Sequence, residues 1–208
     1  MEIKELTGKD IGHPVLKGST VNVSNGFDIT AGGVDIWDTS DQFHFSYQEQ
    51  KGDFDFVARI EALSSADLYT KSGILARESL EANCQHVYLF TFPDNSPRNS
   101  NNGGVEFQYR TIRGGESKAI YPSVHTKEPP EFPVSFPNTW MRMTRNGDRF
   151  DSYYSTSGNR WHLYTSFMLK MNPKIYLGFA VTSHNFKETV TTKVRDVSAV
   201  SGASTSDG

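Results

Sequence analysis

The chain has 208 residues, a length that all-β sandwich domains reach without dividing into two. Its formal net charge is −3, and the sequence contains no cluster of Lys or Arg residues. Both features argue against nucleic-acid binding, because that binding depends on neutralising phosphates. No apolar stretch approaches the roughly 20 residues that a membrane span needs, so membrane insertion is not expected. The 14 Phe, 9 Tyr and 3 Trp favour strands and an aromatic core.

The ends of the chain and its one cysteine bear on compartment and domain limits. Residues 1–9 lack the apolar core of a signal peptide, which fits either an intracellular protein or a mature or excised domain. Cys84 is alone, so no disulfide forms within the chain, and we expect a small buried side chain there. We expect one domain over 1–200 and a flexible Ser- and Gly-rich tail at 201–208.

Apolar and polar residues alternate along the chain, which predicts strands, and no segment has the periodicity of a helix. In the stretch from 52 to 63, Phe54, Phe56 and Ile60 share one face, which is typical of a half-buried strand. The segments with similar alternation are 86–92, 105–112 and 174–181.

The pair Asn146-Gly147 predicts a β-hairpin, since it suits a two-residue type I′ turn in which both central residues take positive φ. Such a turn would set Met143 opposite Phe150 on the core face. It would set Arg142 opposite Asp151 on the other face.

Two long stretches carry turn-forming residues in place of strand patterns, namely 93–104 and the four-proline segment 128–137. Loops of this length are often binding loops or mobile segments. A dozen or so short strands without a helix predict a sandwich or a barrel, and the long edge loops favour a sandwich.

Several segments together resemble a known family, and they are 10–20, 31–48, 52–60, 71–79, 146–161 and 175–185. In this order they resemble bacterial concanavalin-A-like, laminin-G-like domains, over about residues 10–197. The resemblance implies an all-β, two-sheet antiparallel jelly-roll sandwich. It also implies glycan binding or adhesion by a module attached to secreted proteins, and hence a secreted or periplasmic location, with a cytoplasmic one left open by the missing signal peptide.

Sugar sites combine aromatic rings, which stack on the C–H face of the sugar, with planar or charged groups that hold its hydroxyls. The candidate ligand-binding residues on a concave sheet face or its loops are Trp37, His44, Arg77, His86, Tyr109, Arg110, His184 and Asn185. Neighbouring strand residues point to opposite faces, so Arg77 and Glu78 cannot both line one groove.

Most of these candidates also have a structural interpretation. Arg77 fits a hydroxyl or carboxylate clamp or a salt bridge across the sheet, and Trp37 fits a sugar platform or a core residue. His44 and His86 fit binding residues or hydrogen-bonded sheet residues. His184-Asn185 fits ligand contact or turn capping. Tyr121, near the proline-rich stretch, fits a sugar platform or a small loop core.

No catalytic residues are predicted. A glycosidase needs two carboxylates in one groove, and Asp53 and Asp55 lie on the polar side of a strand that begins at a turn. No metal motif or cofactor loop is present in the sequence. A structural Ca²⁺ near Asp10 and Asp196 is implied only by analogy with the fold.

Three functions follow from these observations. The first is a non-catalytic carbohydrate-binding or adhesion module with a glycan as its partner. The second is a uronan lyase with Arg77, His86 and Tyr88 or Tyr109 in a groove. The third is a protein-interaction domain, with homo-oligomers as one form, acting through the loops at 93–104 and 128–137.

Overall fold

Fourteen strands form two antiparallel sheets of seven strands each in the computed structural model, which describes residues 3, 5–93, 104–121 and 134–201. The first sheet has the order β1 (Thr7–Ile11), β4 (Phe43–Lys51), β13 (Lys174–Thr182), β6 (Lys71–Arg77), β7 (His86–Thr91), β8 (Val105–Arg110) and β9 (Lys118–Ile120). The second has the order β12 (His162–Met168), β11 (Arg149–Ser155), β10 (Thr139–Asn146), β5 (Phe54–Leu63), β14 (Val190–Ser201), β3 (Gly26–Ala31) and β2 (Ser19–Val23).

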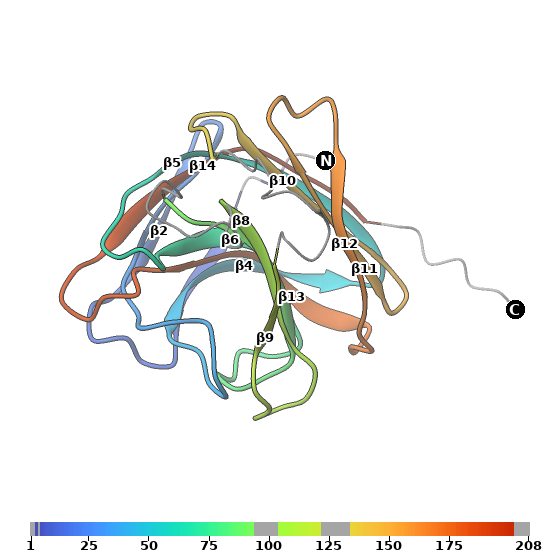
Figure 1. Cartoon of the computed structure of the whole chain (residues 1–208), viewed down its shortest axis with the longest axis horizontal. Coiled ribbons are helices and arrows are strands. Elements are labelled where there is room, and N and C mark those ends of the chain that lie inside the picture. The colour runs from blue at the N-terminus through green and yellow to red at the C-terminus, as the bar shows by residue number, and fades with distance from the viewer. Residues whose placement is uncertain (1–2, 4, 94–103, 122–133, 202–208) are drawn as a thin grey trace, which may run out of the picture.

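The two sheets face one another, and the predicted jelly-roll sandwich is confirmed. Strands β5, β10 and β14 of the second sheet arch over β4, β6 and β13 of the first (Figure 1). The residues that the structure describes form strands and connections, and none of them forms a helix. No helix in that part of the chain is therefore long and apolar enough to cross a membrane.

An aromatic core lies between the sheets, as the alternation predicts. In β5, Phe54, Phe56 and Ile60 are buried against the first sheet. The ring centre of Phe56 lies 5.4 Å from that of Phe179 in β13, and Phe27 of β3 lies 6.2 Å from the same ring. Contacts of this kind hold the two sheets face to face.

A second core covers the outer face of the first sheet, which is the face turned away from the second sheet. Phe45 of β4, Leu75 of β6 and Tyr88 of β7 belong to it, together with Ile36 from the β3–β4 connection. Because loops cover this face, β6 is buried on both sides, and its alternation does not separate a wet side from a dry one.

The loops that cover the outer face are tied to one another by backbone hydrogen bonds. Asp41 N donates to Ala82 O at 2.9 Å, and Ser117 N donates to Asp38 O at 2.7 Å. The β3–β4, β6–β7 and β8–β9 connections gather at the lower end of the molecule (Figure 1).

The β10–β11 hairpin exists, but its predicted register is wrong. Asn146 pairs with Arg149, so the two turn residues are Gly147 and Asp148, and Met143 faces Ser152 in place of Phe150. Gly147 has a φ of 61°, and Gly is the residue that type II′ turns require at this first central position. The shift by two residues leaves every side chain on its predicted face.

Some predicted features lie partly or wholly outside the described residues. Residues 94–103 of the first predicted loop and 128–133 of the second are outside them, as are residues 202–208 of the predicted tail. The last described residue, Ser201, pairs with Phe54 at the end of β14.

Candidate functional site

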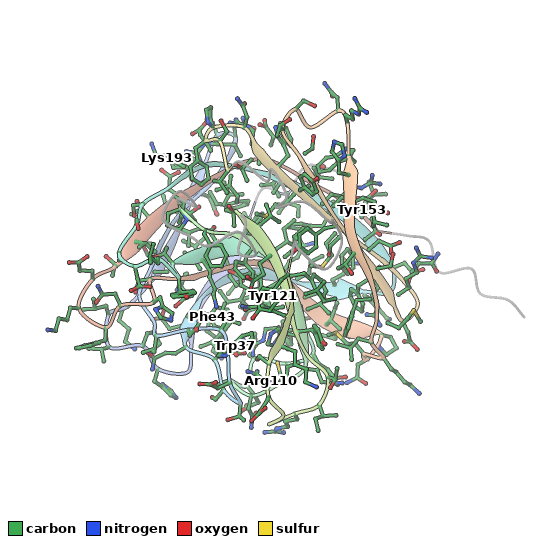
Figure 2. The ribbon with its side chains drawn as sticks, viewed as in Figure 1. Trp37, Phe43, Arg110, Tyr121, Tyr153 and Lys193 are labelled. Atoms are coloured by element: carbon green, nitrogen blue, oxygen red, sulfur yellow. The ribbon has the colours of Figure 1, made fainter. Side chains whose placement is uncertain are left out.

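A pocket of about 310 Å³ lies at one end of the outer face of the first sheet. Its lining residues come from strands β6 and β8 and from the connections beside them. They are Asp35, Trp37, Tyr69, Lys71, Phe92, Glu106, Gln108, Tyr121 and His184. Trp37 and Tyr121, which both belong to this lining, are labelled in Figure 2.

Strand alternation explains which β8 side chains reach the pocket. Val105 and Phe107 point into the core between the sheets, so Glu106 and Gln108 point to the outer face. In β6, the Ser72 hydroxyl donates to Thr192 Oγ1 in the second sheet at 3.1 Å. The preceding residue, Lys71, therefore points the other way, into the pocket.

Charged side chains from four segments contact one another in and beside the pocket, and three of them, Asp35, Lys71 and His184, line it. Lys71 Nζ donates to Asp35 Oδ1 at 2.6 Å. The second oxygen of Asp35 lies 3.4 Å from His184 Nε2. The Nδ1 atom of the same imidazole lies 3.1 Å from Asp67 Oδ1 in the β5–β6 connection.

The contacts continue along β8. Lys71 Nζ lies 3.4 Å from Gln108 Oε1, and Gln108 Nε2 donates to Glu106 Oε1 at 3.0 Å. The resulting run of contacts, which we call the polar chain, comprises Asp67, His184, Asp35, Lys71, Gln108 and Glu106. It joins three loops or loop ends to two strands, so it holds the walls of the pocket in place.

The charges in the polar chain shift each other's pKa. The hydrogen bond to Asp35 raises the pKa of His184 against the opposing effect of burial, and the negative charges of Asp35 and Asp67 raise it further. Burial acts to raise the pKa of Asp35, but the hydrogen bonds and charges of His184 and Lys71 outweigh it, so this pKa lies below its ordinary value. Asp35 is therefore ionised at neutral pH, and His184 keeps its proton to a higher pH than a free imidazole.

Aromatic rings form the rest of the pocket. Tyr69 is 46% exposed, and its ring packs edge-on against Phe92 with 6.3 Å between centres and lies 5.3 Å from His184. Trp37 is half-buried, with Lys71 Nζ 5.8 Å from its ring centre. Burial and the nearby charge of Glu106 raise the pKa of Tyr121, so its hydroxyl stays protonated.

The structure brings two of the sequence-predicted residues, Trp37 and His184, into the pocket. Tyr121, which the sequence analysis left between a loop core and a sugar platform, also lines it. The other predicted residues lie elsewhere, in three different surroundings.

Arg77, His86 and Arg110 surround the buried carboxylate of Asp41, and each of the three has 0% exposure. Arg110 holds both oxygens of Asp41, at 2.7 and 2.9 Å, and Arg77 Nη2 lies 3.5 Å away from the carboxylate. The carboxylate also lies 3.7 Å from Nδ1 of His86. Arg77 therefore has the surroundings that its structural interpretation describes, because it is buried and lies within ion-pair distance of Asp41.

This cluster also supports the pocket. Arg110 Nη2 donates to the backbone oxygens of Trp37 at 3.0 Å and Asp38 at 3.2 Å. These hydrogen bonds hold the backbone of the β3–β4 connection in place, while the Trp37 side chain lines the pocket. Arg110 positions a pocket residue without reaching the pocket surface itself.

His44, Tyr109 and Asn185 are engaged in other contacts. His44 is 3% exposed, with Nδ1 2.8 Å from Asp10 Oδ1 and Nε2 2.9 Å from Thr20 Oγ1, and these contacts link β1 and β4 to β2 of the other sheet. The Tyr109 ring lies 4.2 Å from that of Phe167 on the core side of β8.

Asn185 has the turn-capping role that the sequence analysis considered for it. Its side-chain oxygen accepts from Lys187 N at 2.9 Å, and its amide nitrogen donates to Ala66 O at 3.2 Å. These bonds stabilise the connection that carries His184.

The sequence analysis missed Asp35, Lys71, Glu106 and Gln108. The phase of the alternation in 105–110 was a usable signal, because Phe107 marks the core side and so places Glu106 and Gln108 opposite it. Nothing comparable was available for Asp35, which comes from an irregular connection.

The two residues suggested for calcium by analogy each have donors of their own. Asp10 accepts from Gly18 N at 3.0 Å and contacts His44, whereas Asp196 accepts from Arg59 Nε at 2.6 Å. Within the described parts of the chain, no group of three or more His, Cys, Asp or Glu residues is arranged to hold a metal ion.

Comparison with known proteins places the chain by fold. No family model matches it, and no curated protein matches it. A functionally unknown protein from Saccharomyces cerevisiae superposes with a TM-score of 0.67 at 13% identity, over 94% of this chain and 97% of that one. The carbohydrate-binding module CBM66 from Bacillus subtilis has a TM-score of 0.56 at 13% identity, over 92% and 94% of the two chains.

Lectin II from Ulex europaeus is similar as well, with a TM-score of 0.54 at 7% identity over 95% of this chain and 92% of the lectin. At these identities the likeness extends to the fold and no further. The chain therefore has the jelly-roll sandwich fold that these lectin and carbohydrate-binding structures share.

Proposed function

We propose that this protein is a non-catalytic carbohydrate-binding protein that holds a saccharide in the pocket at the end of the first sheet. The observation that carries the proposal is the composition of the pocket, in which aromatic rings stand beside the polar chain. Rings offer stacking surfaces to the C–H face of a sugar, and carboxylate and amide groups accept from and donate to its hydroxyls. The lectin and carbohydrate-binding neighbours in the fold comparison support the same proposal.

The size of the pocket favours the end of a glycan over a long stretch of polymer. Its volume of about 310 Å³ is at the lower limit of the range for small-molecule sites, which is about 300 to 1,000 Å³. Such a volume accommodates a short saccharide end. We therefore expect binding to depend on the terminal sugar.

The arrangement suggested for a uronan lyase does not occur. That hypothesis needs Arg77, His86 and Tyr88 or Tyr109 in an open groove, but Arg77, His86 and Tyr88 each have 0% exposure. The Tyr88 hydroxyl donates to Ala180 O at 2.9 Å, and burial keeps its pKa well above the ordinary value of tyrosine. These residues are not placed to neutralise a uronate or abstract its proton.

A glycan array probed with the full chain tests the proposal, followed by calorimetric titration of the sugars that bind. Trp37→Ala should weaken binding about tenfold, which corresponds to about 1.4 kcal/mol, because it removes an aromatic wall of the pocket.

The matched control is Trp161→Ala. Trp161 directly precedes β12 of the second sheet and lies outside the pocket lining, with its ring centre 6.0 Å from the guanidinium carbon of Arg142. This variant should bind as the native chain does. Binding that survives Trp37→Ala unchanged, or an array without any bound glycan, would contradict the proposal.

A further inference from the structure

His184 lies between two carboxylates that belong to different connections. Its Nε2 atom is 3.4 Å from Asp35 Oδ2 in the β3–β4 connection, and its Nδ1 atom is 3.1 Å from Asp67 Oδ1 in the β5–β6 connection. The other titratable groups that face the ring are Tyr69 and Lys71. The ordinary pKa is about 4 for a carboxyl and about 10 for lysine or tyrosine, so histidine is the side-chain type in this group that titrates near neutral pH.

The turn that carries His184 is fixed by hydrogen bonds that do not involve its ring. Ser183 Oγ donates to Asn185 O at 2.7 Å, and Asn185 Nδ2 donates to Ala66 O at 3.2 Å. His184 itself has a φ of 55°, a left-handed conformation that is uncommon outside glycine. The backbone therefore presents the imidazole to both carboxylates whatever the charge of the ring.

Only the protonated ring can donate to both carboxylates. An imidazolium has two N–H donors, whereas a neutral imidazole has one donor and one acceptor, and an ionised carboxylate only accepts. When the proton leaves, one of the two contacts sets a nitrogen lone pair against a carboxylate. The side chain of Asp35 is 22% exposed and that of Asp67 is 38% exposed, so water replaces a lost donor more readily at Asp67. We therefore expect the remaining donor to stay with Asp35 and the contact with Asp67 to be lost.

Asp67 also contacts the part of the pocket wall that Tyr69 forms. The same Oδ1 atom accepts from Tyr69 N at 2.8 Å, and the Tyr69 ring centre lies 5.3 Å from that of His184. The end of this connection is tied down separately, since Thr70 Oγ1 donates to Ser183 O at 2.8 Å. Loss of the contact between Asp67 and His184 therefore acts on the short turn that begins at Asp67, and Tyr69 of this turn lines the pocket.

We infer that His184 is a positioning residue which, while it carries its proton, holds Asp67 and through it the Tyr69 wall, and that saccharide affinity falls when the proton is lost. The inference rests on the proposed function, because it concerns the regulation of binding in the same pocket. The hydrogen bond to Asp35 is the main reason that the pKa of His184 is raised, so the fall in affinity lies above about pH 6.5. The protein then binds its saccharide more tightly in mildly acidic solution than in alkaline solution.

The test is a calorimetric titration of the native chain, repeated in steps from about pH 6 to about pH 9. The probes are the methyl glycosides of glucose, galactose and mannose, together with the glycan that binds best on the array. The affinity of the probe that binds should fall about fivefold with rising pH, which is at the lower end of the usual coupling between two sites.

NMR titration of the native chain measures the same coupling from the side of the proton. The resonance of His184 is assigned by its absence from His184→Gln. A saturating concentration of the sugar should raise the pKa of His184 by about 0.7, the logarithm of fivefold, because binding and protonation affect each other equally. The fall in affinity should lie between the pKa values of the free and the sugar-bound chain.

Three variants test the route from the proton to the pocket. His184→Gln cannot take up a proton, Asp67→Asn removes the charge that distinguishes the two states of the ring, and Tyr69→Ala removes the wall. In each of them the affinity should vary by less than about twofold over the same pH range. The control is His162→Gln, which replaces an exposed histidine outside the pocket lining and should keep the native pH profile.

The outcomes separate this inference from the proposed function. Sugar binding that does not weaken with rising pH, or a pKa of His184 that the sugar leaves unchanged, would overturn the inference and still support a saccharide site. A chain that binds no probe at any pH and no glycan on the array would overturn both. The two titrations use the native chain, so they decide the question even if a variant does not fold.

Discussion

Asp41 shows how much a single buried residue organises. Its carboxylate is 2% exposed and contacts Arg110 and Arg77, whose guanidinium carbon also lies 5.1 Å from the ring centre of Phe43. Two cations of this kind are tolerated away from water because the carboxylate, backbone oxygens and aromatic faces surround them. The cluster accounts for the burial of residues that their charge alone would place at a surface.

The change Asp41→Asn should lower the free energy of unfolding by about 3 to 5 kcal/mol, because it leaves two buried guanidinium groups without their counter-charge. Urea denaturation monitored by tryptophan fluorescence measures the effect. The control is Glu81→Gln, where the acid is 67% exposed and lies 4.0 Å from Arg113, and its effect should stay below about 1 kcal/mol. Equal midpoints for Asp41→Asn and the native chain would contradict this account of the cluster.

At the scale of elements, the β10–β11 hairpin has a different register from the one that its local turn motif predicts. The dipeptide Asn146-Gly147 favours a turn centred on itself, yet Asn146 is the last paired residue of β10. Strand β10 also pairs with β5, where Met143 lies opposite Phe56 and Arg145 opposite Phe54. The register of the hairpin is therefore constrained by the pairing of β10 with β5 as well as by the turn.

Two substitutions distinguish the observed turn from the predicted one. Gly147→Ala should cost about 1 kcal/mol in the free energy of unfolding, because alanine disfavours the φ of 61°. Asn146→Ala should change it by less than about 0.5 kcal/mol, since Asn146 is an exposed strand residue. Thermal or urea unfolding of both variants measures the difference. A cost at Asn146 as large as that at Gly147 would favour the predicted turn.

At the scale of the whole molecule, the first sheet is covered on both faces. The core between the sheets lies on one side, and loops pack on the other through Ile36, Leu80 and their neighbours. This second cover explains why polar residues of β6, β7 and β8 are buried. The pocket lies at one end of this covered face.

The stability of the whole chain should fall as the pH drops below about 6.5, the ordinary pKa of histidine. Burial lowers the pKa of His86 well below its ordinary value, and the charges of Arg110 and Arg77 lower it further. The unfolded chain therefore takes up a proton that the folded chain does not, which lowers stability by up to about 1.4 kcal/mol per pH unit until the folded pKa is reached.

Urea unfolding of the native chain and of His86→Asn at about pH 6.5 and 5.5 measures this dependence. The slope should be shallower in the variant, whatever its stability at neutral pH. His184 does not obscure the result, because its raised folded pKa places its own effect above about pH 6.5. Parallel slopes for the two chains would show that His86 is protonated in the folded state.

Alternation along single segments was sufficient to predict the all-β class, the strand faces in β5 and the aromatic core, because side-chain direction in a strand is a local property. The chemistry of sugar recognition, applied to the segments that resemble the family, gave Trp37 and His184 as candidate residues, and both line the pocket. Alternation could not show that Arg77, His86 and Arg110 are buried, because it assigns a side chain to a face without showing what covers that face.

The pocket itself was decided only by the tertiary structure. Asp35, Lys71 and Glu106 are far apart in the sequence, and they meet because β6 and β8 flank β7 while the β3–β4 connection folds over their outer face. Contacts between distant segments depend on strand order and loop packing, which no short window of residues encodes. The sequence thus determines strands and their faces, and the packing of loops on the first sheet determines which polar residues form a site.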